Sequence, residues 1–187
     1  MRLKSSKKRM PFRVASRKSV FRGSRIQLDI LQIRTAEGRS VERELIRHPG
    51  AVVIIPRLSD GRLVLIRQLR VSTGQEIWEF PAGTLEKGES IFHCATRELQ
   101  EETGFKPGRL CKVLEFYPTP GISTEKMYLF FARKLQRVAS TACDPDEVLK
   151  VETFSSRQLK EMIQRGRIID GKTILGFLFY KNFLNKV

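Results

Sequence analysis

The chain has 187 residues, of which 41% are hydrophobic and 29% charged, and its formal net charge is +15 at pH 7. This composition excludes a wholly disordered chain and suffices for the core of one domain. The three cysteines form no Cys-x-x-Cys pair, which argues against a disulfide framework and a thiolate zinc site. No apolar run reaches the roughly 20 residues of a membrane span, and no apolar segment follows the basic start, so we expect a cytoplasmic protein without a secretory signal.

Positive charge is concentrated at the start of the chain. Ten of the 35 basic residues lie within residues 1–25, before the first acidic residue, Asp29. We predict that residues 1–17 form a basic flexible arm. Such an arm can touch nucleic acid or an acidic membrane surface. Residues 1–10 carry no interleaved aromatic residues to stack on bases, so we expect a solvated basic tail rather than a nucleic-acid partner, and we expect no membrane partner.

Residues 18–47 are predicted to form an antiparallel β-hairpin. Apolar and polar residues largely alternate along Ile26–Arg34, and Val41–Ile46 returns as the second strand. The turn between them lies at Glu37-Gly38. Because an isolated hairpin is marginally stable, its apolar face is expected to pack on its own core or on another subunit.

Residues 48–187 are predicted to form one α/β domain. Ala51–Pro56 is a continuous apolar run, as in a buried central strand, and the turn at Asp60-Gly61 predicts Leu63–Gln68 as its hairpin partner. Three further strands are predicted at Lys112–Tyr117, Met127–Ala132 and Val148–Thr153. Two late helices are predicted at Ser156–Gln164, capped by Ser155 or Ser156, and at Lys172–Leu184. This order favours a mixed sheet with helices on its faces.

Residues 83–105 are the most informative segment and contain a further helix. Ser90 suits its N-cap, and Gly104 suits the left-handed position past its C-terminus. An apolar face recurs every four residues, at Ile91, Ala95 and Leu99. Beside it, one acidic face is formed at positions i, i+3 and i+4 by Glu98, Glu101 and Glu102.

Three neighbouring carboxylates destabilise a helix unless a cation lies between them. Clustered carboxylate oxygens suit hard divalent ions such as Mg²⁺ or Mn²⁺, and a Mg²⁺ held this way usually takes substrate phosphates as further ligands. Arg97 is expected to face away from this acidic face, where it can pair with Glu89 and tie the preceding loop to the helix. A solvated acidic helix face is the alternative interpretation, but it leaves the glycines, Glu89 and Arg97 unexplained.

Gly83, Glu89 and the unbroken run from Arg97 to Phe105 resemble a complete Nudix box, with every defined position matched. The box covers 23 residues, and the similarity extends from about residue 40 to the C-terminus. The resemblance implies the Nudix α/β/α sandwich with a mixed sheet. It also implies hydrolysis of nucleoside diphosphates linked to another moiety, with two or three Mg²⁺ or Mn²⁺ ions per site.

Features outside the box resemble the ADP-ribose pyrophosphatases and related nucleoside diphosphate sugar hydrolases. Trp78–Gly83 is similar to their usual entry into the box. Pro120, sixteen residues after Gly104, is the mark associated with ADP-ribose hydrolysis, although a simple rigid turn also explains it. This subfamily typically uses a leading hairpin to build a homodimer with partly shared active sites, so the resemblance implies dimerisation through residues 18–47.

By resemblance, the expected metal ligands are oxygen atoms of the box and of one acid outside it: the Ala82 carbonyl and the carboxylates of Glu98, Glu101, Glu102 and Glu147. Hydrolysis also needs a group that takes the proton of the attacking water. Glu147 is expected to be that base or an extra ligand, with Asp146 and Asp144 as alternatives in the same acidic loop. Glu101 and Arg97 complete the expected catalytic set.

Substrate phosphates need cations, and arginine forks suit them. Arg70 is the best candidate, and Arg43, on the leading hairpin, is the next by resemblance. Glu79 is expected to accept a hydrogen bond from a ribose or a base edge. An adenine ring needs an aromatic or apolar sandwich, which Phe21 or Trp78 can supply, although a tryptophan is more often a core residue.

Three functions are compatible with these features. The first is hydrolysis of a nucleoside diphosphate sugar, with ADP-ribose as the leading substrate. The second is Nudix hydrolysis of another derivative, such as GDP-mannose, a dinucleoside polyphosphate or a capped RNA end, where a basic arm would be useful. The third is a nucleotide-sensing module without catalysis, which has no need of clustered carboxylates that destabilise a helix.

Overall fold

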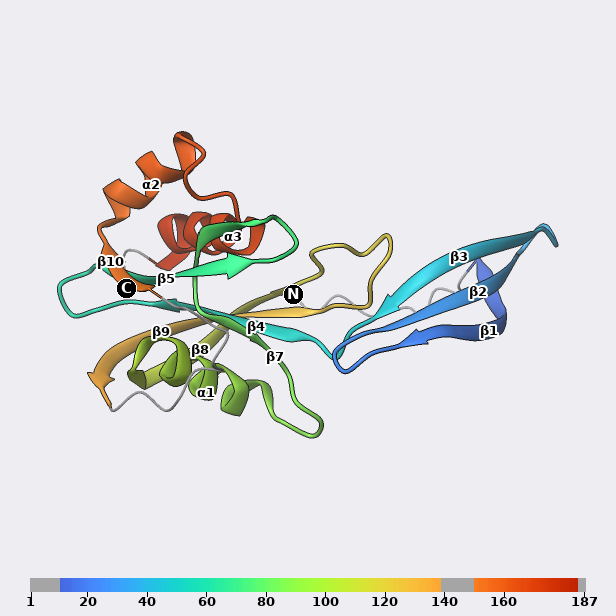
Figure 1. The fold of residues 1–187 in the computed structure, drawn as a ribbon, viewed down its shortest axis with the longest axis horizontal. Helices are drawn as coiled ribbons and strands as arrows, with labels where there is room; N and C mark the ends of the chain where they lie inside the picture. The colour runs from blue at the N-terminus through green and yellow to red at the C-terminus, as the bar shows by residue number, and fades with distance from the viewer. Residues whose placement is uncertain (1–10, 139–149, 185–187) are drawn as a thin grey trace, which may run out of the picture. The chain divides into compact units, whose positions relative to one another are not determined.

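The computed structural model describes residues 11–138 and 150–184 of the chain. The chain divides into two compact units, one formed by residues 1–48 with 119–125 and the other by residues 49–118 with 126–187. Figure 1 labels most of the helices and strands in both units. Each unit has its own hydrogen-bonded sheets and is described separately.

The first unit is a three-stranded antiparallel sheet in the order β1-β2-β3. Its strands are β1 (Phe12–Arg22), β2 (Gln27–Thr35) and β3 (Ser40–Arg47). Gly38 takes a φ of 82° in the predicted turn between β2 and β3, a backbone conformation that favours glycine. Loop 119–125 joins this unit, because the Ile46 N–H donates to the Ile122 carbonyl (2.8 Å) and the Thr124 N–H donates to the Ile46 carbonyl (2.9 Å).

The prediction of a two-stranded hairpin over residues 18–47 is therefore corrected to a sheet of three strands. Phe12–Arg17, which we assigned to a flexible arm, belongs to β1. The basic residues of this segment suggested an unstructured arm, but an edge strand whose residues are all exposed accommodates such charges. Residues 1–10 of the predicted arm lie outside the described residues.

The second unit contains a four-stranded mixed sheet in the order β7-β4-β9-β8. Its strands are β4 (Ala51–Pro56), β7 (Ala82–Thr84), β8 (Phe105–Phe116) and β9 (Met127–Arg137). β4 pairs in parallel with β9 and antiparallel with β7, while β8 and β9 are antiparallel. The predicted mixed sheet is confirmed, and every residue of its central strand β4 is buried.

A second sheet in this unit has the order β10-β5-β6. Its strands are β5 (Leu63–Arg70), β6 (Gln75–Glu79) and β10 (Lys150–Phe154). The prediction that β4 and β5 pair as a hairpin is wrong, because only one isolated bridge, between Arg57 and Leu63, joins the two segments. Both edges of β4 are taken by β7 and β9, so β5 pairs with β6 and β10 instead.

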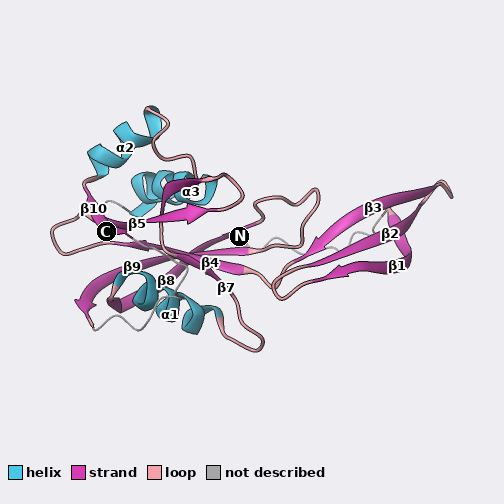
Figure 2. Ribbon diagram, in the orientation of Figure 1, coloured by secondary structure: helices cyan, strands magenta, loops and turns pink. Residues whose placement is uncertain are grey.

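Helices cover both faces of the mixed sheet, as Figure 2 shows. They are α1 (Ile91–Thr103), α2 (Ser156–Gln164) and α3 (Gly171–Phe179), and α3 continues into the π-helical turn η1 (Tyr180–Leu184). On one face of β4, Val52 and Ile54 pack with Leu99 of α1. On the other face, Val53 packs in a cluster that includes Phe177 of α3. No helix among the described residues is long and apolar enough to span a membrane.

Candidate active site

Helix α1 is fixed at both ends by the residues that the sequence indicated. Ser90 is the N-cap, and its hydroxyl accepts the His93 N–H at 3.2 Å. Gly104 is the C-cap with a φ of 68°, and its N–H donates to the Gln100 carbonyl at 2.9 Å. Ala95 and Leu99 are fully buried against the sheet. The register of α1 is thereby set, and with it the direction of its acidic side chains.

Two acids of α1 point toward strand β7. The Ala82 N–H donates to Oε2 of Glu102 at 2.9 Å, and the Glu102 residue is only 6% exposed. One turn earlier, the Glu98 carboxylate lies so close to Gly83 that a Cβ added there would be 1.9 Å from Oε1. Only a glycine leaves room for this approach. The predicted helix face therefore brings two carboxylates to the backbone of Ala82 and Gly83.

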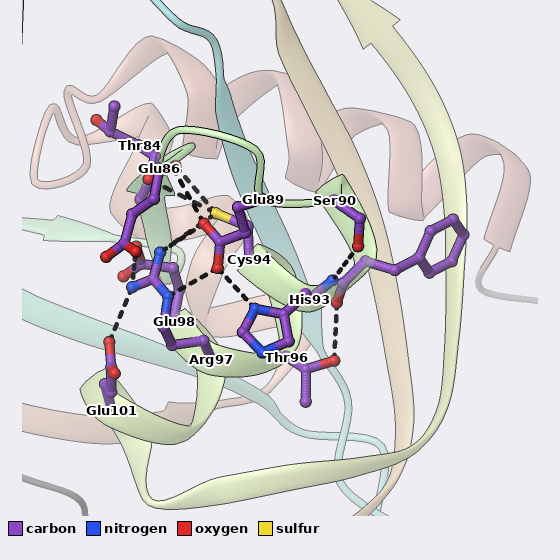
Figure 3. Close-up of polar contacts among 12 residues, drawn as sticks. Thr84, Glu86, Glu89, Ser90, His93, Cys94, Thr96, Arg97, Glu98 and Glu101 are labelled. Atoms are coloured by element: carbon purple, nitrogen blue, oxygen red, sulfur yellow. Dashed lines mark hydrogen bonds and ion pairs between the residues drawn. The ribbon is translucent and has the colours of Figure 1, made fainter.

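Arg97 joins the loop before α1 to the acidic face of the helix (Figure 3). Its Nε and Nη2 donate to the two oxygens of Glu89 at 2.9 and 3.0 Å, which confirms the predicted pair. Its Nη1 also lies 2.8 Å from Oε1 of Glu98 and 3.0 Å from Oε2 of Glu101. The expectation that Arg97 faces away from the acids is therefore wrong, because its long side chain bends back between them. This cation offsets the repulsion among the carboxylates.

The same loop contact changes the acidity of Glu89. The hydrogen bonds from Arg97 lower the pKa of this carboxyl from 4.5 to about 2, against the opposing effect of its burial. Oε1 of Glu89 also lies 2.8 Å from Nδ1 of His93, a residue for which the sequence suggested no role. Glu89 is thus held as a carboxylate and anchors the loop that leads into α1.

The donor set on α1 suits a hard divalent cation. Glu98, Glu101 and Glu102 offer carboxylate oxygens, and the Ala82 segment adds a backbone carbonyl, which are the atoms that Mg²⁺ and Mn²⁺ prefer. Within residues 11–138 and 150–184, no three acidic, histidine or cysteine side chains already converge on a single point. The Glu98 and Glu101 carboxylates instead converge on Arg97. The residue types therefore fit a metal, which would compete with Arg97 for these oxygens.

A second charged network surrounds Glu79, at the end of β6. The Glu79 side chain is 1% exposed and accepts hydrogen bonds from Nε and Nη2 of Arg70, both at 2.7 Å. Oε2 of Glu79 also accepts from Nζ of Lys172, and this ammonium lies 3.0 Å from Oδ1 of Asp170. The hydrogen bond to Glu79 raises the pKa of Arg70, and the negative charge of Glu102 on α1 adds to this effect.

Arg70 and Glu79, expected to bind substrate separately, are thus partners in one ion pair. Sequence reasoning missed Lys172 and Asp170, although the Asp170-Gly171-Lys172-Thr173 stretch contains an evident N-cap residue for α3. The cap was detectable from the sequence. The contact of Lys172 with a carboxylate 93 positions earlier was not, because only the packing of α3 creates it.

Trp78 has a different environment from Glu79. Consecutive residues of a strand point to opposite faces, so the two side chains leave β6 in opposite directions. Trp78 is half-buried, makes an edge-to-face contact with Phe154 (centroids 5.1 Å apart), and lines a cavity of about 290 Å³ beside α2 with Met162 and Arg165. The stacking partner expected for a base therefore packs on an aromatic side chain of β10.

The other expected site residues lie elsewhere in the chain. Arg43, on β3, and Pro120, in loop 119–125, are exposed residues of the first unit. Phe21, on β1 of the same unit, is 55% exposed. Glu147, with its alternatives Asp144 and Asp146, lies outside the described residues.

Comparisons of this sequence with a family model and with known proteins point to the same family. Residues 47–175 match the family model described as the NUDIX domain. The chain is 31% identical to the ADP-ribose pyrophosphatase of Bacillus subtilis (strain 168) over 84% of this chain and 86% of that protein. It is 32% identical to the methanol dehydrogenase activator of Bacillus methanolicus over 83% and 85%. It is also 34% identical to the GDP-mannose pyrophosphatase of Yersinia pestis (strain Pestoides F) over 76% and 77%.

A solved structure described as an ADP compounds hydrolase superposes with a TM-score of 0.82. The superposition covers 97% of this chain and 98% of that chain at 23% identity, which shows a common fold. The chain therefore belongs to the Nudix family. It is a Nudix pyrophosphatase, a hydrolase of nucleoside diphosphate derivatives, in a family that typically uses divalent metal ions.

Proposed function

We propose that this protein hydrolyses the diphosphate bond of nucleoside diphosphate sugars, with ADP-ribose as its leading substrate and AMP and ribose 5-phosphate as products. The observation that carries this proposal is the meeting of the Glu98 and Glu102 carboxylates at the Ala82-Gly83 backbone, backed by Arg97. The substrate class is supported by the relative named ADP-ribose pyrophosphatase. GDP-mannose is the second candidate, because another relative is named GDP-mannose pyrophosphatase at similar identity.

In this proposal, the Ala82 carbonyl, Glu98 and Glu102 would hold the metal ions, and Glu101 would support them. Two or three Mg²⁺ or Mn²⁺ ions, when bound, neutralise the charge that grows on the phosphate oxygens and make the attacking water more acidic. The Ala82 N–H bond fixes the carboxylate of Glu102. Arg97 fixes Glu98 and Glu101 and thereby organises the acidic face before substrate arrives.

Water attacks a phosphorus atom, the bridging P–O bond breaks, and the proton of the water passes to a base. We assign this base to Glu147, with Asp146 and Asp144 as alternatives, because Glu98, Glu101 and Glu102 already serve the metal ions. Glu101, which Arg97 contacts, is the next choice if all three residues of the acidic loop prove dispensable.

Substrate binding is assigned to groups around this centre. Arg70 bonds Glu79 through two of the five N–H donors that a guanidinium carries, which leaves donors for a phosphate. Arg43 is proposed to supply a second phosphate contact, and Trp78 and Pro120 are proposed to shape the nucleoside site. We also propose a homodimer built through the β1–β3 sheet, whose β1 exposes large apolar side chains at Phe12, Val14, Val20 and Phe21.

A substrate panel tests the proposal. We expect Mg²⁺-dependent release of AMP from ADP-ribose with a kcat/KM at least tenfold above that for GDP-mannose, UDP-glucose, diadenosine polyphosphates and capped RNA. The matched control is Glu102→Gln, which should lose turnover on every substrate. Preferred cleavage of GDP-mannose would select the second candidate. Hydrolysis of capped RNA or dinucleoside polyphosphates alone would overturn the proposal.

A further inference from the structure

Lys172 joins the network around Glu79 from helix α3. Its ammonium donates to Oε2 of Glu79, the same oxygen that accepts from Nη2 of Arg70, and it lies 3.0 Å from Oδ1 of Asp170. The Lys172 side chain is 15% exposed, against 34% for Arg70 and 1% for Glu79. Lys172 is therefore the inner cation of the network, and Arg70 is the cation that reaches solvent.

The position of Lys172 is fixed by the start of α3. Asp170 is the N-cap, and its Oδ2 accepts from both the backbone N–H of Thr173 (2.9 Å) and its hydroxyl (2.5 Å). Oγ1 of Thr173 in turn accepts the Phe80 N–H at 2.8 Å. A Cβ on Gly176 would meet the Phe80 ring at 3.3 Å, so the helix packs closely on this segment. The first turn of α3 is thus bonded to Glu79-Phe80, two residues before Ala82.

A buried carboxylate with two cations is held more firmly than one with a single partner. Glu79 bonds Arg70 in a two-point fork, and this geometry depends on the orientation of the carboxylate plane. Lys172 donates a hydrogen bond to one of the two carboxylate oxygens and also offsets the negative charge of Glu79. Burial disfavours the charged form of Glu79, and Arg70 and Lys172 together offset this effect. Without Lys172, Arg70 alone would stabilise the buried carboxylate.

We propose that Lys172 is a positioning residue, which acts through Glu79 to hold the Arg70 guanidinium in the orientation that receives a substrate phosphate. This inference rests on the proposed function and adds α3 to the elements that build its phosphate site. Asp170, the N-cap of α3, in turn contacts the Lys172 ammonium and helps to hold it beside Glu79. Lys172 itself stays bonded to Glu79 and does not contact the substrate.

A double-mutant cycle with Arg70 tests the inference, with inorganic pyrophosphate in the presence of Mg²⁺ as the calorimetric probe. Lys172→Met should weaken pyrophosphate binding about tenfold, since members of one salt-bridge network are coupled. In turnover of ADP-ribose, it should raise KM more than it lowers kcat. In an Arg70→Gln background, the same change should cost less than about twofold, because its target is already gone. Lys160→Met, at an exposed lysine of α2, is the matched control and should change neither quantity.

The outcomes separate this inference from the proposed function. Equal losses from Lys172→Met in both backgrounds, or a Lys172→Met variant that binds like Lys160→Met, would overturn the positioning role. So would a wild-type protein without measurable pyrophosphate binding. Failure to cleave any nucleoside diphosphate sugar would overturn the proposed function, whereas the cycle in pyrophosphate affinity would still decide the inference. Urea unfolding of each variant checks that the fold is retained.

Discussion

Gly83 is the residue where a single methyl group would disturb the acidic face most directly. A Cβ there would overlap the Glu98 carboxylate at 1.9 Å, so Gly83→Ala must displace that side chain. We expect turnover to fall about tenfold or more, as when a metal site is weakened, with little loss of stability, because the displaced atoms lie at the far end of the Glu98 side chain. Gly171→Ala is the control, because a Cβ there meets nothing within 4 Å. Steady-state kinetics and urea unfolding measure both effects, and normal turnover in Gly83→Ala would show that Glu98 can move without loss.

Glu102 is the acid with the closest tie to the strand. Glu102→Gln keeps an oxygen for the Ala82 N–H but removes one ligand charge. We expect a loss of about 10–100-fold in metal affinity or rate, as is usual when a metal site is weakened. The folded state should be equally or more stable, because the change relieves crowding of like charges. Rates across a Mg²⁺ titration give the measurement, and a near-wild-type rate at saturating Mg²⁺ would contradict the metal role.

Glu89 should make the protein sensitive to acid. Its pKa is about 2 in the folded state and 4.5 ordinarily, so the folded state binds this proton less tightly than the unfolded state does. The stability that Glu89 contributes is therefore present above pH 4.5 and is lost as the pH falls toward 2. As the pH is lowered between these values, the free energy of unfolding in urea should fall more steeply for the wild type than for Glu89→Gln. Parallel pH profiles would mean that the Arg97 pair contributes nothing to stability.

At the scale of elements, α1 and α2 are capped in the same way but serve different purposes. Ser90 caps α1, and Ser155 caps α2, where the Ser155 N–H also donates to Oε1 of Gln158. Replacing either serine by alanine should lower the free energy of unfolding by about 1 kcal/mol. Only Ser90→Ala is expected to alter the Mg²⁺ dependence of turnover, because α1 carries the acids. Melting curves and metal titrations compare the two variants. Equal effects on the Mg²⁺ dependence of turnover would show that the Ser90 cap has no specific influence on the acidic face of α1.

The elements also show where local patterns stop being informative. The helix Ser156–Gln164 was predicted to the residue, because its cap and periodicity are local signals. The partners of β4, which are β7 and β9, were not predicted. An apolar strand followed by a turn can pair with several neighbours, and its own sequence does not distinguish among them. The short strands β6 and β7 were not predicted, since five and three residues carry too little periodicity.

At the scale of the whole molecule, we expect a homodimer through the β1–β3 sheet. Val14, Val20 and Phe21 of β1 are 46%, 44% and 55% exposed, and burying such apolar side chains against another surface is favourable. Sedimentation at micromolar concentration should show a dimer, and Phe21→Glu should shift it toward monomer. Lys18→Glu, at an exposed position of the same strand, is the control for added charge. A wild-type protein that sediments only as a monomer would refute this prediction.

The sequence by itself determined the family, the acidic face of α1, its caps and the Arg97–Glu89 pair. All of these depend on spacing within 23 residues, and helix geometry converts such spacing directly into neighbours in space. The Arg97–Glu101 contact is an i, i+4 pair within α1 and was open to the same local reasoning, whereas tertiary structure alone decided that Lys172 meets Glu79. The Lys172–Glu79 contact joins residues 93 positions apart. It exists because α3 packs on the segment before the Nudix box, and no local pattern specifies which distant side chains such packing brings together.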